Sequence, residues 1–241
     1  REIVLTGIEI ASYGRDLPNR PTLADVIERV AAAAPEARIR LGSLEPTAVT
    51  EEFCRRIAAV PGLCPHFHLS MQSGSDGVLK RMNRKYDTAE FYAVCERLRR
   101  HFPRCALTTD LITGFPGETE EEFRETLDFI RKCAFASMHV FPYSRRPGTK
   151  ADALPGQLTH AVKNERAREA IAAAREMKLA YLAGCVGLTE SVLFETESGG
   201  LSFGHGRDYT EIRVEGIGLR GLVKNVKILA VDGEMLVGAV V

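Results

Sequence analysis

Strand-like and helix-like segments alternate through the first 150 residues of this 241-residue chain. Five extended runs, about 30 residues apart, are separated by amphipathic segments of the kind that form helices. The extended runs are REIVLTGIEIASYG, ARIRLGSLEP, HFHLSMQSGS, CALTTDLITGFPGE and ASMHVFPYSRRPGT. Strands joined by helices form right-handed βαβ units, so the alternation predicts an α/β fold with a parallel sheet. The sheet is either open and doubly wound or curved into a barrel.

The third run favours the barrel, because only one of its two faces is apolar. Side chains of a strand point alternately to opposite faces. Phe67, Leu69 and Met71 therefore share one face, and His68, Ser70 and Gln72 share the other. In a doubly wound sheet helices cover both faces, and the strands are nearly continuous apolar runs. We therefore expect a partial, open (β/α) barrel of the TIM type, whose polar face lines a cavity.

The pattern changes after residue 150. Residues 157–183 are rich in Ala, Arg and Glu and predict one long helix. From residue 188 onward, short alternating runs are separated by glycine-containing turns, which predicts a small antiparallel β-barrel. We accordingly divide the chain into a partial barrel (1–155), a connecting helix (156–185) and a small all-β barrel (186–241).

Composition excludes few classes of function. The formal net charge is zero, so the whole-chain charge favours neither a polyanionic nor a polycationic partner. No apolar run approaches the roughly 18 residues that a membrane span needs. No signal peptide is visible, although the chain begins at Arg1, as if cut from a longer protein. We expect a cytoplasmic protein that does not enter a membrane.

The six cysteines are scattered along the chain. None forms a C-x-x-C pair, and none has a histidine at zinc-finger spacing. Single cysteines in a chain without a secretion signal are most often reduced core residues. We therefore predict no metal site among them. They are Cys54, Cys64, Cys95, Cys105, Cys133 and Cys185.

Each extended run ends in residues that are unusual for a plain core. Ligand sites of parallel α/β structures lie at the carboxyl ends of the strands. Glycines such as Gly7 and Gly114 let a ligand approach the backbone closely. Directional hydrogen bonds would come from Glu45, Gln72, Ser73 and Asp110. We predict that these residues line one ligand site.

Two charged runs have local explanations. Thr119 is a plausible helix cap, and the acids at 120–122 then lie in the first turn, where they complement the helix dipole. This run therefore predicts a helix start and not a metal site. The basic run at 79–86 is typical of a solvated helix face, but Arg81 or Arg84 is also a candidate clamp for a carboxylate.

Taken in order, these motifs resemble the radical S-adenosylmethionine (SAM) methylthiotransferases. The matching stretches are TGIEIASYG, RLGSLEP, HFHLSMQSGSDGVLKRMNRKY, TDLITGFPGETEEEF and FPYSRRPGTKA. The stretch GHGRDYTEIRV looks like the TRAM domain of that family, a small β-barrel associated with RNA binding. TGI…SYG and GSLEP look most like the branch that acts on threonylcarbamoyladenosine in tRNA. The isopentenyladenosine branch and the ribosomal-protein branch are alternatives, and QSGS argues against the latter.

The resemblance implies a reaction and its cofactors. SAM bound to a [4Fe-4S] cluster yields a 5′-deoxyadenosyl radical, which abstracts hydrogen from C2 of the adenosine at position 37 of the tRNA anticodon loop. A methylthio group is then inserted, with sulfur delivered by a second [4Fe-4S] cluster. The resemblance places Ile112 and Gly114 by the SAM adenine and Gly7 near the methionine amino group. Ser43, Glu45, Gln72, Ser73 and Phe141 would line the cavity, with Arg84 as the candidate carboxylate partner.

One departure from the family is large. The C-x-x-x-C-x-x-C motif that holds the family's first cluster is absent, and so are the first barrel strand and the domain that binds the second cluster. We therefore expect a catalytically inactive fragment of a longer enzyme, whose electron donor and sulfur source the sequence does not specify. The alternatives are a non-catalytic RNA-binding protein and an ordinary (β/α)-barrel enzyme. From residue 186 onward, five Lys and Arg stand against eight Asp and Glu, so we expect weak RNA binding by that part alone.

Overall fold

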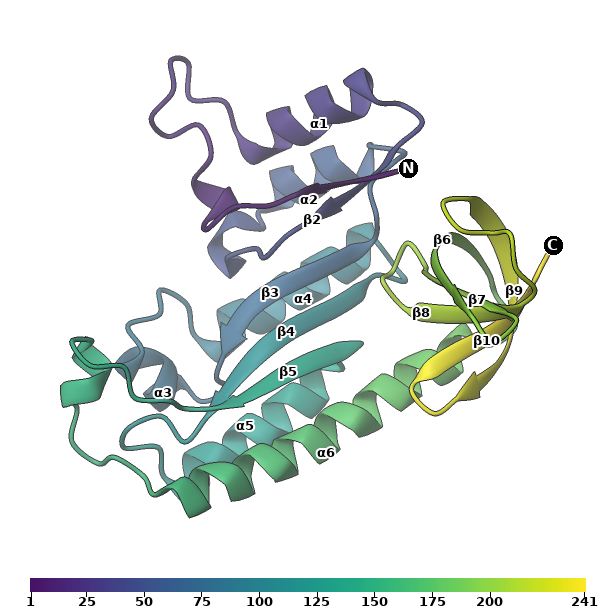
Figure 1. Cartoon of the computed structure of the whole chain (residues 1–241). Helices are drawn as coiled ribbons and strands as arrows, with labels where there is room; N and C mark the ends of the chain where they lie inside the picture. The colour runs from purple at the N-terminus through teal and green to yellow at the C-terminus, as the bar shows by residue number, and fades with distance from the viewer.

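A computed structural model describes all residues from 1 to 241. The first part of the chain alternates strands with helices, and the last part contains only strands (Figure 1). The first five strands are β1 (Glu2–Leu5), β2 (Arg38–Leu41), β3 (His66–Gln72), β4 (Ala106–Thr113) and β5 (Ser137–Pro142). The helices are α1 (Leu23–Ala33), α2 (Glu51–Ala58), α3 (Asp76–Arg81), α4 (Thr88–His101), α5 (Glu120–Cys133) and α6 (His160–Cys185). None of these helices has the length and apolarity required to cross a membrane.

The first five strands are all parallel, as the alternation of elements predicted. β1 pairs with β2, and β3, β4 and β5 form a second ladder in that order. The two ladders are joined where Leu44, just beyond β2, lies beside β3. Its amide donates to the carbonyl of His68 at 2.8 Å, and its carbonyl accepts from the amide of Ser70 at 3.2 Å. The carboxyl ends of all five strands therefore lie along one edge.

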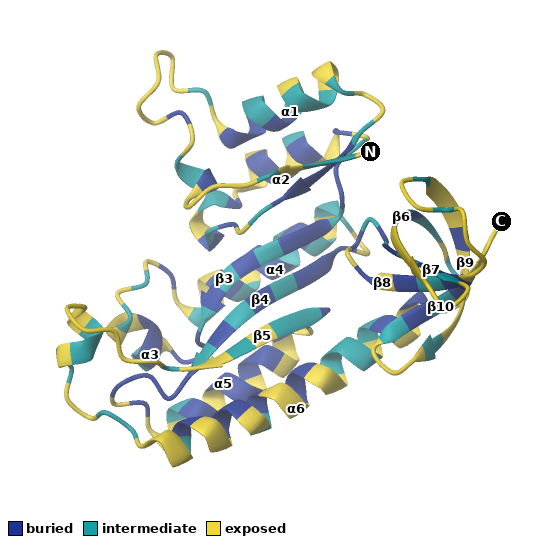
Figure 2. Ribbon diagram, viewed as in Figure 1, coloured by how far each residue is buried: buried dark blue, intermediate teal, exposed yellow.

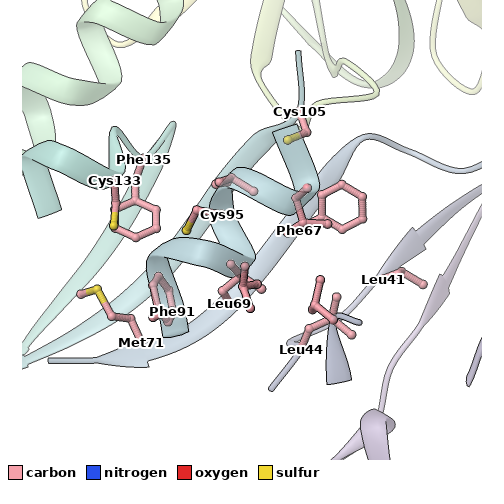
Figure 3. Close-up of a cluster of buried hydrophobic side chains, with 14 of the residues drawn as sticks. Leu41, Leu44, Phe67, Leu69, Met71, Phe91, Cys95, Cys105, Cys133 and Phe135 are labelled. Carbon is pink, nitrogen blue, oxygen red and sulfur yellow. The ribbon is translucent and has the colours of Figure 1, made fainter. Parts of the chain in front are cut away.

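Strand β3 has one buried face and one partly open face, which confirms the reading of its sequence. Phe67, Leu69 and Met71 are fully buried. They pack into the cluster drawn in Figure 3, together with Phe91 and Cys95 of α4. His68, Ser70 and Gln72 are only partly covered. Figure 2 shows that the helices likewise turn their buried sides toward the strands and their exposed sides outward.

The helix starts follow from local sequence. Thr119 caps α5: its hydroxyl accepts from the amide of Glu122, whose carboxylate in turn accepts from the amide of Thr119. The acidic run is thus a helix start, as predicted. The long helix α6 begins later than predicted, at His160 and not at residue 157. The hydroxyl of Thr159 accepts from the amide of Val162 and sets that boundary.

The first strand is also shorter than its sequence suggested. We predicted a strand-like run as far as Gly14, but β1 ends at Leu5 and a short 3-10 turn forms at Ile10–Ser12. The side chain of Ile8 is fully exposed, so no packing partner holds this stretch in an extended form. The residues after β1 therefore form a loop at the carboxyl edge of the sheet.

The last five strands close into a small barrel in the order β10-β8-β7-β6-β9. They are β6 (Thr189–Ser198), β7 (Leu201–His205), β8 (Glu211–Glu215), β9 (Val223–Asp232) and β10 (Met235–Val240). The prediction of an antiparallel barrel is wrong for one of the five ladders, because β10 pairs with β8 in parallel. Strand β10 turns back antiparallel along β9, and closing the barrel then brings it beside β8 in the same direction.

The two parts have separate hydrophobic cores. One cluster of 33 buried residues fills the space between the parallel strands and their helices, and one of 9 fills the small barrel. Helix α6 contributes to both: Ala170 and Ala173 belong to the first, Leu182 and Cys185 to the second. Elsewhere the junction between the parts depends on polar contacts.

A buried cluster of Glu2, Arg38 and Arg40 forms the centre of that junction. Both arginines point from the same face of β2 and pair with the carboxylate of Glu2 on β1. Arg38 also donates to the carbonyls of Ser191 and His205 in the small barrel, at 3.2 and 3.0 Å. Arg40 donates to the carbonyls of residues 206 and 207, at 3.2 and 3.0 Å. The guanidinium groups thereby connect the parallel sheet to the barrel backbone.

Replacement of Arg40 by Met should destabilise the chain by about 3–5 kcal/mol, because Glu2 and the barrel carbonyls would stay buried without a partner. The measurement is urea unfolding followed by circular dichroism. The matched control is Arg55→Met, which breaks an exposed ion pair with Glu52 and should cost no more than about 1 kcal/mol. Equal losses in the two variants would show that the cluster is not the junction's main support.

Candidate functional site

The carboxyl edge of the parallel sheet carries every residue that the resemblance assigned to the SAM site. Gly7 and Ser43 lie in the loops after β1 and β2, Gln72 ends β3, and Ser73 follows it. Ile112 of β4 lies directly opposite Phe141 of β5 in the ladder. The side chain of Phe141 is 52% exposed, which is unusual for a phenylalanine within a sheet. No hydrogen bond joins the side chain of Ser43 to the other proposed residues.

A β-bulge changes the backbone direction at the end of β3. Between the pairs Leu69–Thr109 and Gln72–Leu111, two residues of β3 oppose one residue of β4, and Gln72 adopts a left-handed backbone with φ of +68°. Such a conformation is rare outside glycine, and bulges occur preferentially beside active sites. Within the bulge, the hydroxyl of Thr109 accepts a hydrogen bond from the amide of Met71 and donates one to the carbonyl of Leu69. The site edge is thus strained and held in place by neighbouring side chains.

Glu45 and Arg84 come together at this edge although 39 residues separate them in sequence. One guanidinium nitrogen of Arg84 lies 3.4 Å from the carboxylate of Glu45, and both side chains are partly exposed. Arg81, the other candidate clamp, makes two bonds with the carboxylate of Glu122 and so joins α3 to α5. Arg84 is therefore the arginine with donors to spare for a ligand.

The loop after β4 is shaped by a buried ion pair that the sequence analysis missed. The carboxylate of Glu118 accepts from the amide of Gly114 and from Arg166 of α6, each at 2.8 Å. Burial raises the pKa of Glu118 in spite of these bonds. At Gly114, with φ of +72°, a side chain would collide with Lys163 of α6, only 2.6 Å away. A glycine is therefore required at position 114 both for the turn and for the close packing of α6 against it.

Ser73 is fully buried, and its hydroxyl oxygen accepts from the amide of Ser75 at 3.3 Å. It therefore organises the turn into α3. The hydroxyl of Ser75 donates to Glu125 of α5 at 2.8 Å, so the same turn is tied to the neighbouring helix. In this structure the side chain of Ser73 supports the site edge from behind.

A row of polar side chains crosses the open face of the sheet below this edge. Asp110 lies 3.4 Å from Nε2 of His68 and 3.3 Å from Nδ1 of His139. The hydroxyl of Thr108 lies 3.1 Å from the other nitrogen of His68 and 3.2 Å from Nε2 of His66. The sequence analysis included only His68 of these three histidines. His66 was recognisable, because it is two residues before His68 and so shares its face.

His66 is the most buried member of this row. Its side chain is only 7% exposed, and its Nδ1 atom has no hydrogen-bond partner. Burial, together with the nearby positive charge of Arg40, lowers the pKa of His66 to about 3. The imidazole is therefore neutral at physiological pH.

The six cysteines do not fit an iron–sulfur cluster. All are free and buried, as predicted, and no three His, Cys, Asp or Glu side chains are placed to hold a metal ion. Burial raises the pKa of Cys54 to about 11 and that of Cys105 to about 12, whereas cluster ligands are thiolates. These cysteines are core residues.

The neutral, buried His66 should make stability depend on pH. Its pKa is about 3 in the folded state and about 6.5 when exposed, so the unfolded chain binds the extra proton as the pH falls below 6.5. Stability is then lost from pH 6.5 downward, at about 1.4 kcal/mol per pH unit. In urea titrations, His66→Phe should remove about 2 kcal/mol of the loss that the parent chain suffers between pH 6 and pH 4.5. Parallel pH profiles of parent and variant would contradict this assignment.

Comparison with known proteins places this geometry in a family. The sequence pattern of the radical SAM superfamily matches residues 2–130, more than half of the chain. Coproporphyrinogen III oxidase (HemN) from Escherichia coli, a radical SAM enzyme, aligns in structure with a TM-score of 0.55. The alignment covers 79% of this chain and 52% of HemN at 16% identity, so it supports the fold alone.

Curated relatives sharpen the resemblance. The threonylcarbamoyladenosine tRNA methylthiotransferase MtaB of Thermotoga maritima is 38% identical over 195 residues, which are 81% of this chain and 44% of that protein. The tRNA-2-methylthio-N(6)-dimethylallyladenosine synthase of Caldicellulosiruptor saccharolyticus is 39% identical over 179 residues, 74% of this chain and 38% of that protein. The chain spans less than half the length of these two relatives. The resemblance to methylthiotransferases is thus confirmed, and the chain belongs to the radical SAM superfamily.

Proposed function

We propose that this chain is part of an enzyme that adds a methylthio group to C2 of N6-threonylcarbamoyladenosine at position 37 of tRNA, in the cytoplasm. The observation that carries the proposal is the agreement of two findings. Relatives that modify adenosines of tRNA match most of the chain, and the residues that the resemblance assigns to the SAM site lie along one edge of the sheet. The relatives include both adenosine branches, so the isopentenyladenosine derivative is the second candidate substrate.

The strand edge suits the functional groups of SAM. Arg84 has guanidinium donors left for the carboxylate of the methionine moiety, and Glu45 beside it suits the amino group. Ile112, Phe141 and the backbone of Gly114 offer an apolar and close-fitting surface for the adenine ring. When bound to its cluster, SAM supplies the radical chemistry, and these residues hold and orient it.

The cluster ligands of the proposed enzyme are not among the six buried cysteines. We therefore assign both [4Fe-4S] clusters to parts of the enzyme outside residues 1–241, and the chain alone would be inactive. Its contribution would be most of the wall of the SAM cavity.

For the two parts of the fold we propose family roles. Residues 1–155 would form a partial (β/α) barrel of the TIM type, and 156–185 would connect it to a TRAM-like barrel at 186–241. The closed five-strand barrel and its attachment through Arg38 and Arg40 support this reading. The TRAM-like barrel would contact the anticodon loop of the tRNA.

Deletion of the gene in its own organism tests the proposed substrate. Mass spectrometry of tRNA nucleosides should show loss of 2-methylthio-N6-threonylcarbamoyladenosine and accumulation of its unmethylthiolated precursor. Loss of the isopentenyl derivative instead would identify the second candidate. Unchanged levels of both nucleosides would reject the proposal.

Arg84→Gln, introduced into the gene on a complementing plasmid, should lower the methylthiolated fraction about tenfold or more. The guanidinium bond to a carboxylate that it removes is worth about 1.5–3 kcal/mol. Arg55→Gln is the control and should complement fully, because Arg55 is an exposed residue of α2 whose partner is Glu52. Full complementation by Arg84→Gln at equal protein level would remove Arg84 from the site.

A further inference from the structure

A second cavity lies at the opposite end of the sheet from the proposed SAM site. Its volume is about 230 Å³, and it is enclosed by the starts of β3, β4 and β5, by α6 and by the small barrel. In Figure 1 these strands point away from the barrel, so the cavity is at their amino ends. None of the residues proposed for SAM lines it.

The row of polar side chains described above leads into this cavity, and the protons along it have a defined order. The carboxylate of Asp110 lies 3.4 Å from Nε2 of His68 and favours the proton on that nitrogen, which leaves Nδ1 of His68 as an acceptor. The hydroxyl of Thr108 gives its proton to that nitrogen, so its oxygen accepts from Nε2–H of His66. The remaining nitrogen, Nδ1 of His66, then carries a lone pair. This order of protons, assigned from the network, leaves one buried acceptor without a donor.

Flat rings surround that acceptor. The ring of Tyr209 is stacked on His205 at 4.7 Å and 16°, and its centre lies 5.1 Å from that of His66. Arg40 covers Tyr209 at 4.7 Å. Tyr209 has a left-handed backbone, with φ of +68°, a strained conformation for an aromatic residue. Such surfaces favour planar ligands by stacking.

The volume of the cavity and the charges of its lining restrict the class of ligand further. A volume of about 230 Å³ gives room for one nucleobase. Among the lining residues Lys178 is the one Lys or Arg, and it is paired with Glu234 at 2.9 Å. With Asp208 and Glu211 also present, the lining disfavours a phosphate. The side chains also form no three-ligand metal site.

We propose that this cavity binds a single unpaired RNA base bearing an amino group, adenine or cytosine, whose amino hydrogen bonds to Nδ1 of His66. The proposal rests on the proposed function for the presence of RNA. The base would be a second nucleotide of the substrate, bound at the far end of the sheet from the reacting adenosine. The adenine of SAM has the same amino group, so the experiment separates these two sources.

The test titrates the ¹⁵N-histidine-labelled 241-residue chain with the trinucleotide UAU and with the same trinucleotide carrying purine riboside, which lacks the amino group. UAU should shift Nδ1 of His66 and bind about tenfold more tightly, because only it satisfies the buried acceptor. His66→Phe should abolish this preference, and Thr108→Val, which keeps the shape of the side chain, should reduce it. His160→Phe, an exposed histidine at the start of α6, should retain it.

Equal binding of the two trinucleotides would overturn the inference, and so would an equal loss in His160→Phe. A shift of His66 produced by SAM and not by UAU would assign the cavity to the cofactor and overturn it also. The readout needs no cluster and no methylthio transfer. A preference for UAU with unchanged nucleosides in the deletion strain would therefore retain this inference while rejecting the proposed function.

Discussion

The buried contact of Glu2 with Arg38 and Arg40 determines how the small barrel lies against the parallel sheet. Charges removed from water are tolerated only when paired and hydrogen-bonded. Here each guanidinium satisfies that condition by using the carboxylate of Glu2 and backbone carbonyls of the small barrel together. Two of those carbonyls belong to β6 and β7 and two to the turn after β7, so one orientation of the barrel satisfies both arginines. The orientation in turn brings Tyr209 against His66 and so encloses the second cavity.

Much of the architecture was predictable from short-range patterns. The two-residue period of β3 identified its buried and open faces, and Thr119 followed by Glu122 identified the start of α5. Both depend on neighbours in sequence. The parallel pairing of β8 with β10 was not predictable in this way, because it depends on barrel closure between strands about 20 residues apart.

The sequence predicted at which edge of the sheet the candidate site lies, but not which side chains meet there. Parallel strands align their carboxyl ends, so the sequence pointed to the loops after them, and the structure places those loops along one edge. Which side chains meet there depends on tertiary packing. Arg84 pairs with Glu45, Arg81 pairs with Glu122, and Lys163 packs against Gly114. These partners are far apart in the sequence, so no local periodicity predicts the contacts. Arg38 and Arg40 were not recognised either, since arginines on a strand normally indicate an exposed face.

Helix α6 has a geometric consequence for any ligand that uses both ends of the chain. Lys163 lies against the turn after β4, and Cys185 lies in the core of the small barrel. At 1.5 Å per residue, the helix separates these points by about 33 Å. The helix thus holds these two points at a fixed distance from each other. A free nucleoside is too short to contact both points, whereas a folded RNA arm is long enough.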